Sequence, residues 1–130
     1  MIVDTSAVVA ILQGEPEAAA FAEALAAAGR RLMSAGSYLE LGIVMIDRRG
    51  PRARQAIDGF LAGSLISVVP FDEEQAVLAR DGFMRFGKGR HKAGLNFGDC
   101  MTYALAKRED LPLLFKGTDF GATDIEVATW

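Results

Sequence analysis

The stretch Met1-Ile2-Val3-Asp4-Thr5-Ser6-Ala7 opens the chain and decides the fold. Its apolar start predicts a short buried strand that ends at Asp4. From Ser6 to Leu12 the apolar residues follow helical spacing, which predicts a helix that stops at Gly14. The chain therefore begins with a strand that leads directly into a helix.

The same alternation of short strands and helices continues to the end of the chain. Further strands are predicted at Arg31–Met33, Leu65–Val69 and Leu113–Lys116, with a turn at Gly117. Strands separated by helices pair in parallel through right-handed crossovers, which leaves helices on both faces of the sheet. We therefore expect an α/β fold, a three-layer α/β/α sandwich with a mainly parallel sheet, in which residues 1–130 form a single domain. Helices are predicted at Glu17–Ala28, Ser37–Arg48, Pro51–Gly63, Glu73–Phe86 and Gly98–Arg108.

Composition excludes several classes of protein. Of 130 residues, 51% are hydrophobic and the formal net charge is −3, yet no run of about 18 apolar residues could span a bilayer. The N-terminus lacks a positive region, so we expect a soluble cytoplasmic protein with no membrane contact. The lone Cys100 allows no internal disulfide and no Cys-rich zinc motif, and is expected to be a buried small side chain. A single histidine, His91, gives little support to a Ser-His-Asp triad.

Four acidic residues, Asp4, Glu40, Asp99 and Asp119, each stand where a predicted element begins or ends. Ligands of parallel α/β sheets collect outside the carboxyl ends of the strands, and the fold could bring these four side chains to that edge. Clustered carboxylates repel one another unless a cation holds them. Carboxylate oxygens without His or Cys suit Mg²⁺ or Mn²⁺ better than zinc. Such an ion would activate a water molecule for attack on a phosphodiester.

Each of the four acids also has a purely structural interpretation. Ser37 and Glu40 spell Ser-x-x-Glu, the pattern of a capping box. Asp99 would favour the dipole of a helix that it opens. Asp4 could cap the first helix, and Asp119 could serve the turn after Gly117. Taken together the four favour a metal site, because caps have no reason to be acidic at one edge of one sheet.

A short basic window stands out from the mildly acidic average. Phosphate backbones are attracted to such a window, and bases can stack on exposed aromatic rings, which would make it a contact surface for nucleic acid. Alternatively the rings belong to the core and the cations form a solvated loop. The window contains Arg80, Arg85, Lys88, Arg90, His91 and Lys92, with Phe83, Phe86 and Phe97 within it or close by.

Four motifs in this order resemble one known family over the whole chain. They are Met1-Ile2-Val3-Asp4-Thr5-Ser6-Ala7, Ser37-Tyr38-Leu39-Glu40, Leu95-Asn96-Phe97-Gly98-Asp99-Cys100 and Leu114-Phe115-Lys116-Gly117-Thr118-Asp119-Phe120. Each is short, but together and at comparable separations they are specific. The chain resembles the PIN-domain ribonuclease toxins of the VapC type, the toxic half of bacterial toxin–antitoxin pairs.

The resemblance implies a function and a set of site residues. It implies that Asp4, Glu40, Asp99 and Asp119 bind Mg²⁺ or Mn²⁺ and that the enzyme is an endoribonuclease. In the mechanism we expect, Glu40 orients or deprotonates the attacking water. Ser6 and Thr118 could hold the carboxylates or the scissile phosphate, and Asp124, in Ala122-Thr123-Asp124-Ile125, could support the metals from behind. Partners implied are RNA, a VapB-type antitoxin and a second copy of the chain. RNA contacts are expected at Arg80, Arg85, Lys88, Arg90 and Lys92.

Two other classes of function stay open at the level of sequence. A receiver-like phosphoacceptor signalling domain has about this length, a doubly wound sheet and acids at strand ends. Asp4, Asp72 and Lys116 could imitate its acid–acid–lysine layout, although Glu40 and Asp99 would then have no role. The other alternative is a non-catalytic module that binds RNA or protein with the same fold.

Overall fold

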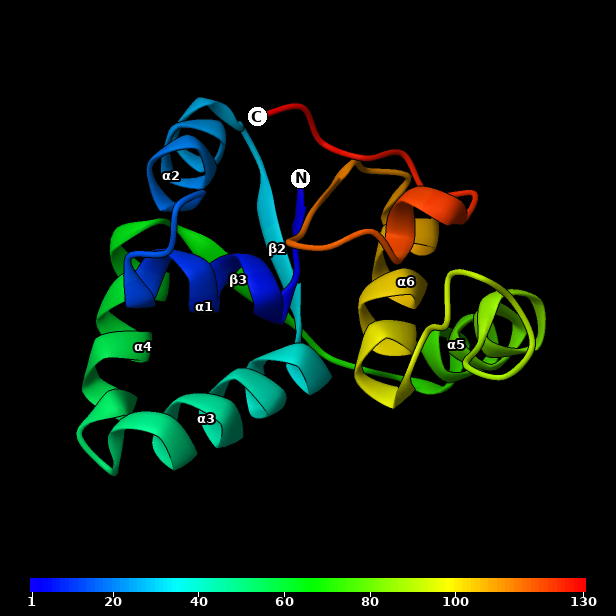
Figure 1. Cartoon of the computed structure of the whole chain (residues 1–130), viewed down its shortest axis with the longest axis horizontal. Helices are drawn as coiled ribbons and strands as arrows, with labels where there is room; N and C mark the ends of the chain where they lie inside the picture. Colours follow the sequence, from blue (N-terminus) through cyan, green and yellow to red (C-terminus); the bar gives the residue numbers. More distant parts are fainter.

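The computed structural model describes all 130 residues and contains one sheet of four parallel strands, in the order β3-β2-β1-β4. Helices lie on both sides of this sheet, α1 to α4 on one side and α5 and α6 on the other (Figure 1). The expected fold class is therefore confirmed. The strands are β1 (Ile2–Val3), β2 (Arg31–Ser34), β3 (Ile66–Val69) and β4 (Leu113–Leu114). The helices are α1 (Thr5–Gln13), α2 (Ala18–Ala27), α3 (Ala35–Arg49), α4 (Ala53–Gly63), α5 (Glu73–Phe86) and α6 (Phe97–Glu109), followed by the 3₁₀ turn η1 (Phe120–Ala122).

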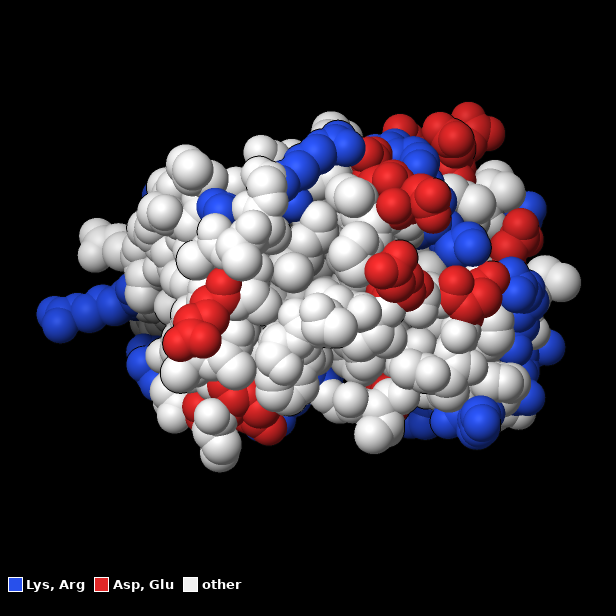
Figure 2. Space-filling view, turned by 90° about the horizontal axis from the view of Figure 1, so that it is seen from above, with Lys and Arg blue, Asp and Glu red and all other residues white.

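The surface of the sandwich carries charges of both signs. Seen from above, acidic and basic side chains lie in small mixed groups, with wide uncharged areas between them (Figure 2). None of the helices is both long enough and apolar enough to cross a membrane.

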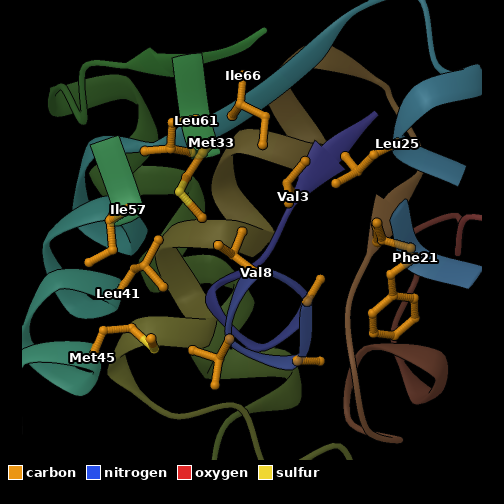
Figure 3. Packing of buried hydrophobic residues seen from close by; sticks show 14 of the residues in the cluster. Val3, Val8, Phe21, Leu25, Met33, Leu41, Met45, Ile57, Leu61 and Ile66 are labelled. Carbon is orange, nitrogen blue, oxygen red and sulfur yellow. The ribbon is translucent and has the colours of Figure 1, made fainter. Parts of the chain in front are cut away.

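The strands place alternate residues into two separate cores. In β1, Val3 packs under α1 to α4, whereas Ile2 faces α5 and α6. The pairs Leu32–Met33 and Leu113–Leu114 divide between the two cores in the same way. Figure 3 shows the first core, in which Val3 and Met33 meet side chains from the surrounding helices. Each fully buried aliphatic side chain contributes about 1.5–3 kcal/mol, so even a two-residue strand is firmly held.

The start of α3 differs from its prediction. Ser34, the last residue of β2, caps the helix by accepting a hydrogen bond from the backbone N–H of Gly36 at 3.3 Å. The helix therefore begins at Ala35 with no intervening loop, and Ser37 lies inside it. The Ser37–Glu40 capping box is wrong for this reason, since Ser37 instead makes a buried hydrogen bond through its hydroxyl to Thr102.

The last strand is shorter than its prediction because the chain leaves the sheet early. β4 ends at Leu114, where the carbonyl oxygen accepts a hydrogen bond from the N–H of Asp4. Two residues on, the N–H of Lys116 donates to the hydroxyl of Ser6 at 2.9 Å instead of to a neighbouring strand. β1 is followed in the sheet by β2 on one side and by β4 on the other, so the strand order reverses between β1 and β4. A crevice at such a switch point is the usual ligand site of this architecture.

Candidate metal centre

An open cleft lies at the carboxyl end of the sheet, where Asp4, Glu40 and Asp99 share its lining. These are three of the four acids that the sequence singles out, and they come from the end of β1, from α3 and from the first turn of α6. The cleft has a volume of about 330 Å³. Its other lining residues are Thr5, Ser6, Val9, Glu15, Val44, Arg48 and Lys116.

Asp4 is the most fixed of the three carboxylates. It is buried and caps α1, with one oxygen accepting hydrogen bonds from the N–H and the hydroxyl of Ser6 at 2.9 and 2.6 Å. The other oxygen accepts from the hydroxyl of Thr102 at 2.7 Å, and Thr102 contacts Ser37 in turn at 2.9 Å. The predicted role of Asp4 as a helix cap is confirmed, and the same hydrogen bonds fix its direction in the cleft.

The carboxylate of Glu40 is held by a hydrogen bond from Thr5 and lies directly against Gly98. Its Oε2 accepts a hydrogen bond from the Thr5 hydroxyl at 2.8 Å. Gly98, at the start of α6, lies against the other side of the carboxylate, where a Cβ atom would come within 2.5 Å of Oε1. No side chain larger than hydrogen fits there while Glu40 keeps this position. The glycine thus lets α6 begin directly beside Glu40.

Asp99 lies in surroundings that disfavour its negative charge. It forms a capping box with Asn96, accepting from the Asn96 N–H at 2.8 Å while its own N–H donates to the Asn96 side chain at 2.9 Å. The pKa of Asp99 is raised to about 6, mainly by burial and in part by the charges of Asp4, Asp119 and Glu40, against the effect of the hydrogen bond from Asn96. The other three predicted acids therefore act electrostatically on Asp99, and a cation would relieve the excess negative charge.

Asp119 takes a more peripheral place than the other three acids. It is exposed, stands just before η1 and does not line the cleft, and the neighbouring Thr118 is exposed as well. No three His, Cys, Asp or Glu side chains are close enough together to hold a metal ion as they stand. The donor set itself, oxygen without nitrogen or sulfur, fits a hard cation such as Mg²⁺ or Mn²⁺. The cleft therefore fits such an ion in chemistry, with a ligand set that is not preformed.

Asp124 lies away from the cleft, in an ion cluster that ties the C-terminal segment to α5 and α6. Its carboxylate contacts Arg85 at 2.9 Å and Lys107 at 3.4 Å, and accepts a hydrogen bond from the hydroxyl of Tyr103 at 2.9 Å. Partial burial acts against ionisation, but the hydrogen bonds from Tyr103 and Arg85 hold the pKa of Asp124 below its usual range. Its contacts are those of a structural clamp.

The basic window borders a second, apolar cleft through Arg80 and does not reach the acidic one. Arg80 lines this second cleft together with Phe83 and Phe97, and the guanidinium of Arg90 lies 5.6 Å from the centre of the Phe83 ring. Phe97 is 81% exposed, whereas Phe86 packs on the core, so the aromatic rings of the window do not all belong to the core. Arg80, Arg85, Lys88, Arg90 and Lys92 are all exposed, and none of them lines the acidic cleft.

Of the two cations that line the acidic cleft, Arg48 was not predicted from the sequence, and Lys116 was named only for the phosphoacceptor alternative. Thr5 and Thr102, which hold Glu40 and Asp4, were not predicted either. A hydroxyl or an amine of a common residue type carries no signal until the fold supplies its partner.

The layout of a phosphoacceptor domain is not assembled. Asp72 caps α5 through the N–H of Gln75 at 3.0 Å and pairs with Arg108 at 3.0 Å, and it does not line the cleft. Asp4 is thus left without the second acid that this alternative requires. Cys100 is buried, as expected, and burial raises the pKa of its thiol to about 11.

Comparison with known proteins identifies the class to which this fold and cleft belong. The model of the PIN domain family matches residues 1–126. Ribonuclease VapC28 of Mycobacterium tuberculosis is 52% identical over 98% of this chain and 97% of its own length. Ribonuclease VapC of Mycolicibacterium smegmatis is 48% identical over 96% of this chain and 97% of its own. The chain therefore belongs to the PIN-domain family, in the group of the VapC ribonucleases.

Solved structures agree with this assignment at the level of the fold. The crystal structure of Mycobacterium tuberculosis VapC20, a Sarcin-Ricin loop cleaving toxin, superposes with a TM-score of 0.79 at 19% identity, covering 98% of each chain. A chain of a toxin–antitoxin complex from Klebsiella pneumoniae superposes with a TM-score of 0.69 at 18% identity, covering 95% of this chain and 92% of that one.

Proposed function

We propose that this protein is the toxin of a type II toxin–antitoxin pair, an endoribonuclease that hydrolyses RNA phosphodiester bonds with Mg²⁺ or Mn²⁺. The observation that carries the proposal is the shared cleft of Asp4, Glu40 and Asp99 at the switch point of the sheet. Membership of the VapC ribonucleases supports RNA as the substrate. A module that only binds RNA or protein would not need three carboxylates in one cleft.

The residues of the cleft have different roles in the proposed reaction. Asp4 and Asp99 would hold the metal ion, together with Asp119 from the segment after β4, and their carboxylate oxygens suit Mg²⁺ or Mn²⁺. Ser6 and Thr102 keep both oxygens of Asp4 in one direction, so that little reorganisation is needed on binding. Glu40, oriented by Thr5, contributes to metal binding and accepts the proton of the attacking water at its carboxylate. Thr118 is free to rotate toward the phosphate because it is exposed.

When bound, the metal ion lowers the pKa of water and neutralises charge on the attacked phosphate. The chain's own contribution is to gather oxygen donors with a net negative charge that only a cation can balance. Burial is the main cause of the raised pKa of Asp99, and repulsion from the neighbouring carboxylates adds to it.

We extend the proposal to the partners and the organisation of the protein. Residues 1–130 form one domain, because every helix packs on one of two cores around a single sheet. A VapB-type antitoxin inhibits the enzyme, and an arginine of the antitoxin takes the place of the cation's charge in the cleft. The toxin–antitoxin complex among the structural neighbours supports such a partner. The protein acts in the cytoplasm as a homodimer.

Cleavage of a cellular RNA pool tests the proposal. Wild type, Asp4→Asn and the matched control Asp81→Asn, an exposed acid outside the cleft, are each incubated with the pool in Mn²⁺ or in a chelator. We expect wild type and Asp81→Asn to cut in Mn²⁺ alone, and Asp4→Asn to lose at least 100-fold in rate, on the order of 3 kcal/mol of transition-state stabilisation.

The outcomes separate the alternatives. Equal cleavage by wild type and Asp4→Asn would reveal a contaminating nuclease. Binding of RNA without cleavage by any of the three proteins would favour the non-catalytic module, and cleavage that persists in the chelator would contradict the metal mechanism.

A further inference from the structure

Lys116 stands beside the acids of the cleft, and the function developed above gives it no role. Its backbone N–H donates to the Ser6 hydroxyl at 2.9 Å, and that hydroxyl donates to Asp4 at 2.6 Å. Lys116 is thus anchored one side chain away from the best-fixed carboxylate of the site. Its own side chain lines the same cleft.

The ammonium group of Lys116 is held by two carboxylates from the connection between α1 and α2. It contacts Glu15 at 2.6 Å and Glu17 at 2.9 Å, and these three side chains are each about one third exposed. Hydrogen bonds to Glu15 and then to Glu17 raise the pKa of Lys116, so it stays charged at neutral pH. One lysine therefore faces two acids, and the trio has a net negative charge.

RNA needs positive charge in this cleft, and few groups can supply it. The lining contains four carboxylates, those of Asp4, Glu15, Glu40 and Asp99, against the cations Lys116 and Arg48. The basic window around α5 does not reach the cleft. A phosphate that enters must therefore meet Lys116 or Arg48, and of the two only Lys116 is anchored to Asp4.

We propose that Lys116 binds a phosphate of the RNA next to the scissile one, and that Glu15 and Glu17 compete with this phosphate for its ammonium group. This inference rests on the proposed ribonuclease function. A solvent-exposed ion pair is worth at most about 1 kcal/mol, so an entering phosphate displaces the carboxylates at little cost. The long flexible stem of lysine allows the ammonium group to turn from one partner to the other.

A purely structural role of the Lys116 contacts predicts different effects on RNA affinity and on stability. If the contacts served only to tie the loop after β4 to the connection between α1 and α2, loss of either partner would lower stability and leave RNA affinity alone. If Glu15 and Glu17 compete with RNA, their neutralisation must strengthen binding, and must do so through Lys116.

A double-mutant cycle tests the proposal on the whole chain. The proteins are wild type, Lys116→Met, Glu15→Gln/Glu17→Gln, and the combination of all three changes. Arg52→Met and Glu23→Gln, exposed residues outside the cleft, serve as controls for the change in charge. Binding of a fluorescein-labelled, random-sequence, single-stranded 20-nucleotide RNA is measured by anisotropy in chelator over a series of salt concentrations. Cleavage of the same RNA is measured in Mn²⁺, and thermal unfolding checks the fold of each protein.

The expected results are specific in sign. Lys116→Met weakens RNA binding about tenfold and reduces the slope of log affinity against log salt by about 0.7, the contribution of one phosphate contact to a single strand. It raises KM more than it lowers kcat. Glu15→Gln/Glu17→Gln strengthens binding about threefold in the presence of Lys116, and this gain vanishes in the Lys116→Met background. Arg52→Met and Glu23→Gln change affinity less than twofold.

Each contrary result has one meaning. An unchanged salt slope in Lys116→Met, or an equal gain from the two glutamine substitutions with and without Lys116, would overturn the proposal and leave only a general charge effect. Lower thermal stability with unchanged RNA affinity in both variants would assign the contacts to structure alone and would also overturn it. If wild type binds RNA but does not cut it in Mn²⁺, the ribonuclease function fails, while the binding cycle still decides the role of Lys116.

Discussion

Asp99 is the residue at which folding and metal binding make opposing demands. Its pKa in the folded protein is about 6, because burial and neighbouring carboxylates disfavour its charge. A group whose pKa is raised on folding stabilises the fold at low pH, and this contribution is lost as the pH rises through 6. The metal-free protein therefore gives up stability at neutral pH to keep Asp99 ionised.

Replacement of Asp99 by asparagine should separate the two demands. We expect Asp99→Asn to abolish cleavage and to raise the stability of the metal-free protein at pH 7.5 by about 1 kcal/mol, discounted for its partial exposure, or roughly 2–5 °C in Tm. Asparagine keeps an oxygen for the capping box with Asn96. Thermal unfolding in chelator from pH 4 to pH 8 is the measurement. A variant that is less stable than wild type at pH 7.5, or a difference that does not shrink toward pH 4, would contradict the electrostatic explanation.

At the scale of single residues, the sequence indicated the acids and one of their supports, Ser6, but missed Thr5 and Thr102. Acids at element ends are recognisable because such positions follow from local patterns. Thr102 and Asp4 are 98 positions apart, and Lys116 and Ser6 are 110 apart, so no spacing rule links them. The hydrogen bond of Thr102 exists because α6 packs against the sheet, and that of Lys116 exists because β1 and β4 are neighbours in it.

Among the elements, α6 depends on Gly98 for its approach to α3. A Cβ atom at position 98 would lie 2.5 Å from Oε1 of Glu40, so the two elements could no longer keep both the helix start and the carboxylate in place. The first turn of α6 also carries Asp99, which ties the geometry of the helix start to the site.

Gly98→Ala should therefore damage activity more than stability. We expect at least a tenfold loss of kcat, since Glu40 must turn away from its hydrogen bond with Thr5, and at most about 1 kcal/mol of destabilisation, because alanine favours a helix. Gly59→Ala, in α4 with no atom near the new methyl group, is the matched control and should keep activity while gaining a few tenths of a kcal/mol. Cleavage kinetics and thermal unfolding of both variants check this. Full activity in Gly98→Ala would show that Glu40 can act from another position.

The prediction of elements succeeded where polar and apolar residues alternate clearly and failed at their junctions. α5 was predicted with the bounds that the structure has, because Asp72 caps it and Gly87 follows it. α3 begins two residues before its predicted start, because Ser34 at the end of β2 caps it and not Ser37. Which serine caps the helix depends on where the preceding strand ends, and the sheet determines this.

At the scale of the whole molecule, Asp124 connects the C-terminal segment to the helices on one face of the sheet. Its partners Arg85, Tyr103 and Lys107 come from α5 and α6. The pKa of Asp124 is lowered in the folded protein, against the effect of partial burial, by Tyr103 and Arg85. A group of this kind stabilises the fold above its unfolded pKa and loses that contribution as the pH falls through its folded pKa.

The stability of Asp124→Asn should consequently depend on pH in a defined way. At neutral pH the variant should unfold at a lower temperature than wild type, and the difference should shrink as the pH falls below about 4, the usual pKa of an aspartate. Thermal unfolding between pH 2.5 and pH 7.5 measures this. Asp110→Asn, an exposed acid at the end of α6 without an ion pair, should behave like wild type throughout. Cleavage in Mn²⁺ by Asp124→Asn at neutral pH should stay within about threefold of wild type, since the clamp lies outside the cleft; a loss as large as that of Asp4→Asn would return Asp124 to the metal site.

The overall architecture was predictable because four β-rich runs separated by helices leave few topologies. The two-core division of each strand follows from alternation along the sheet. The position of the basic window could not be predicted, because its distance from the acids depends on how α5 packs against α6. One cation of the window, Arg80, lines a separate apolar cleft together with Phe97.

The pairing of β1 with β4 brings residues 2–3 against residues 113–114, and it sets a condition on synthesis. A ribosome makes β1 long before it makes β4. An unfinished chain therefore lacks the side of the cleft that contains Lys116, and it lacks the hydrogen bond from Lys116 to Ser6. The proposed RNA-cutting cleft is therefore incomplete on a nascent polypeptide that has not yet reached residues 113–116. The order of the strands thereby delays assembly of the cleft until β4 and the segment after it have been made.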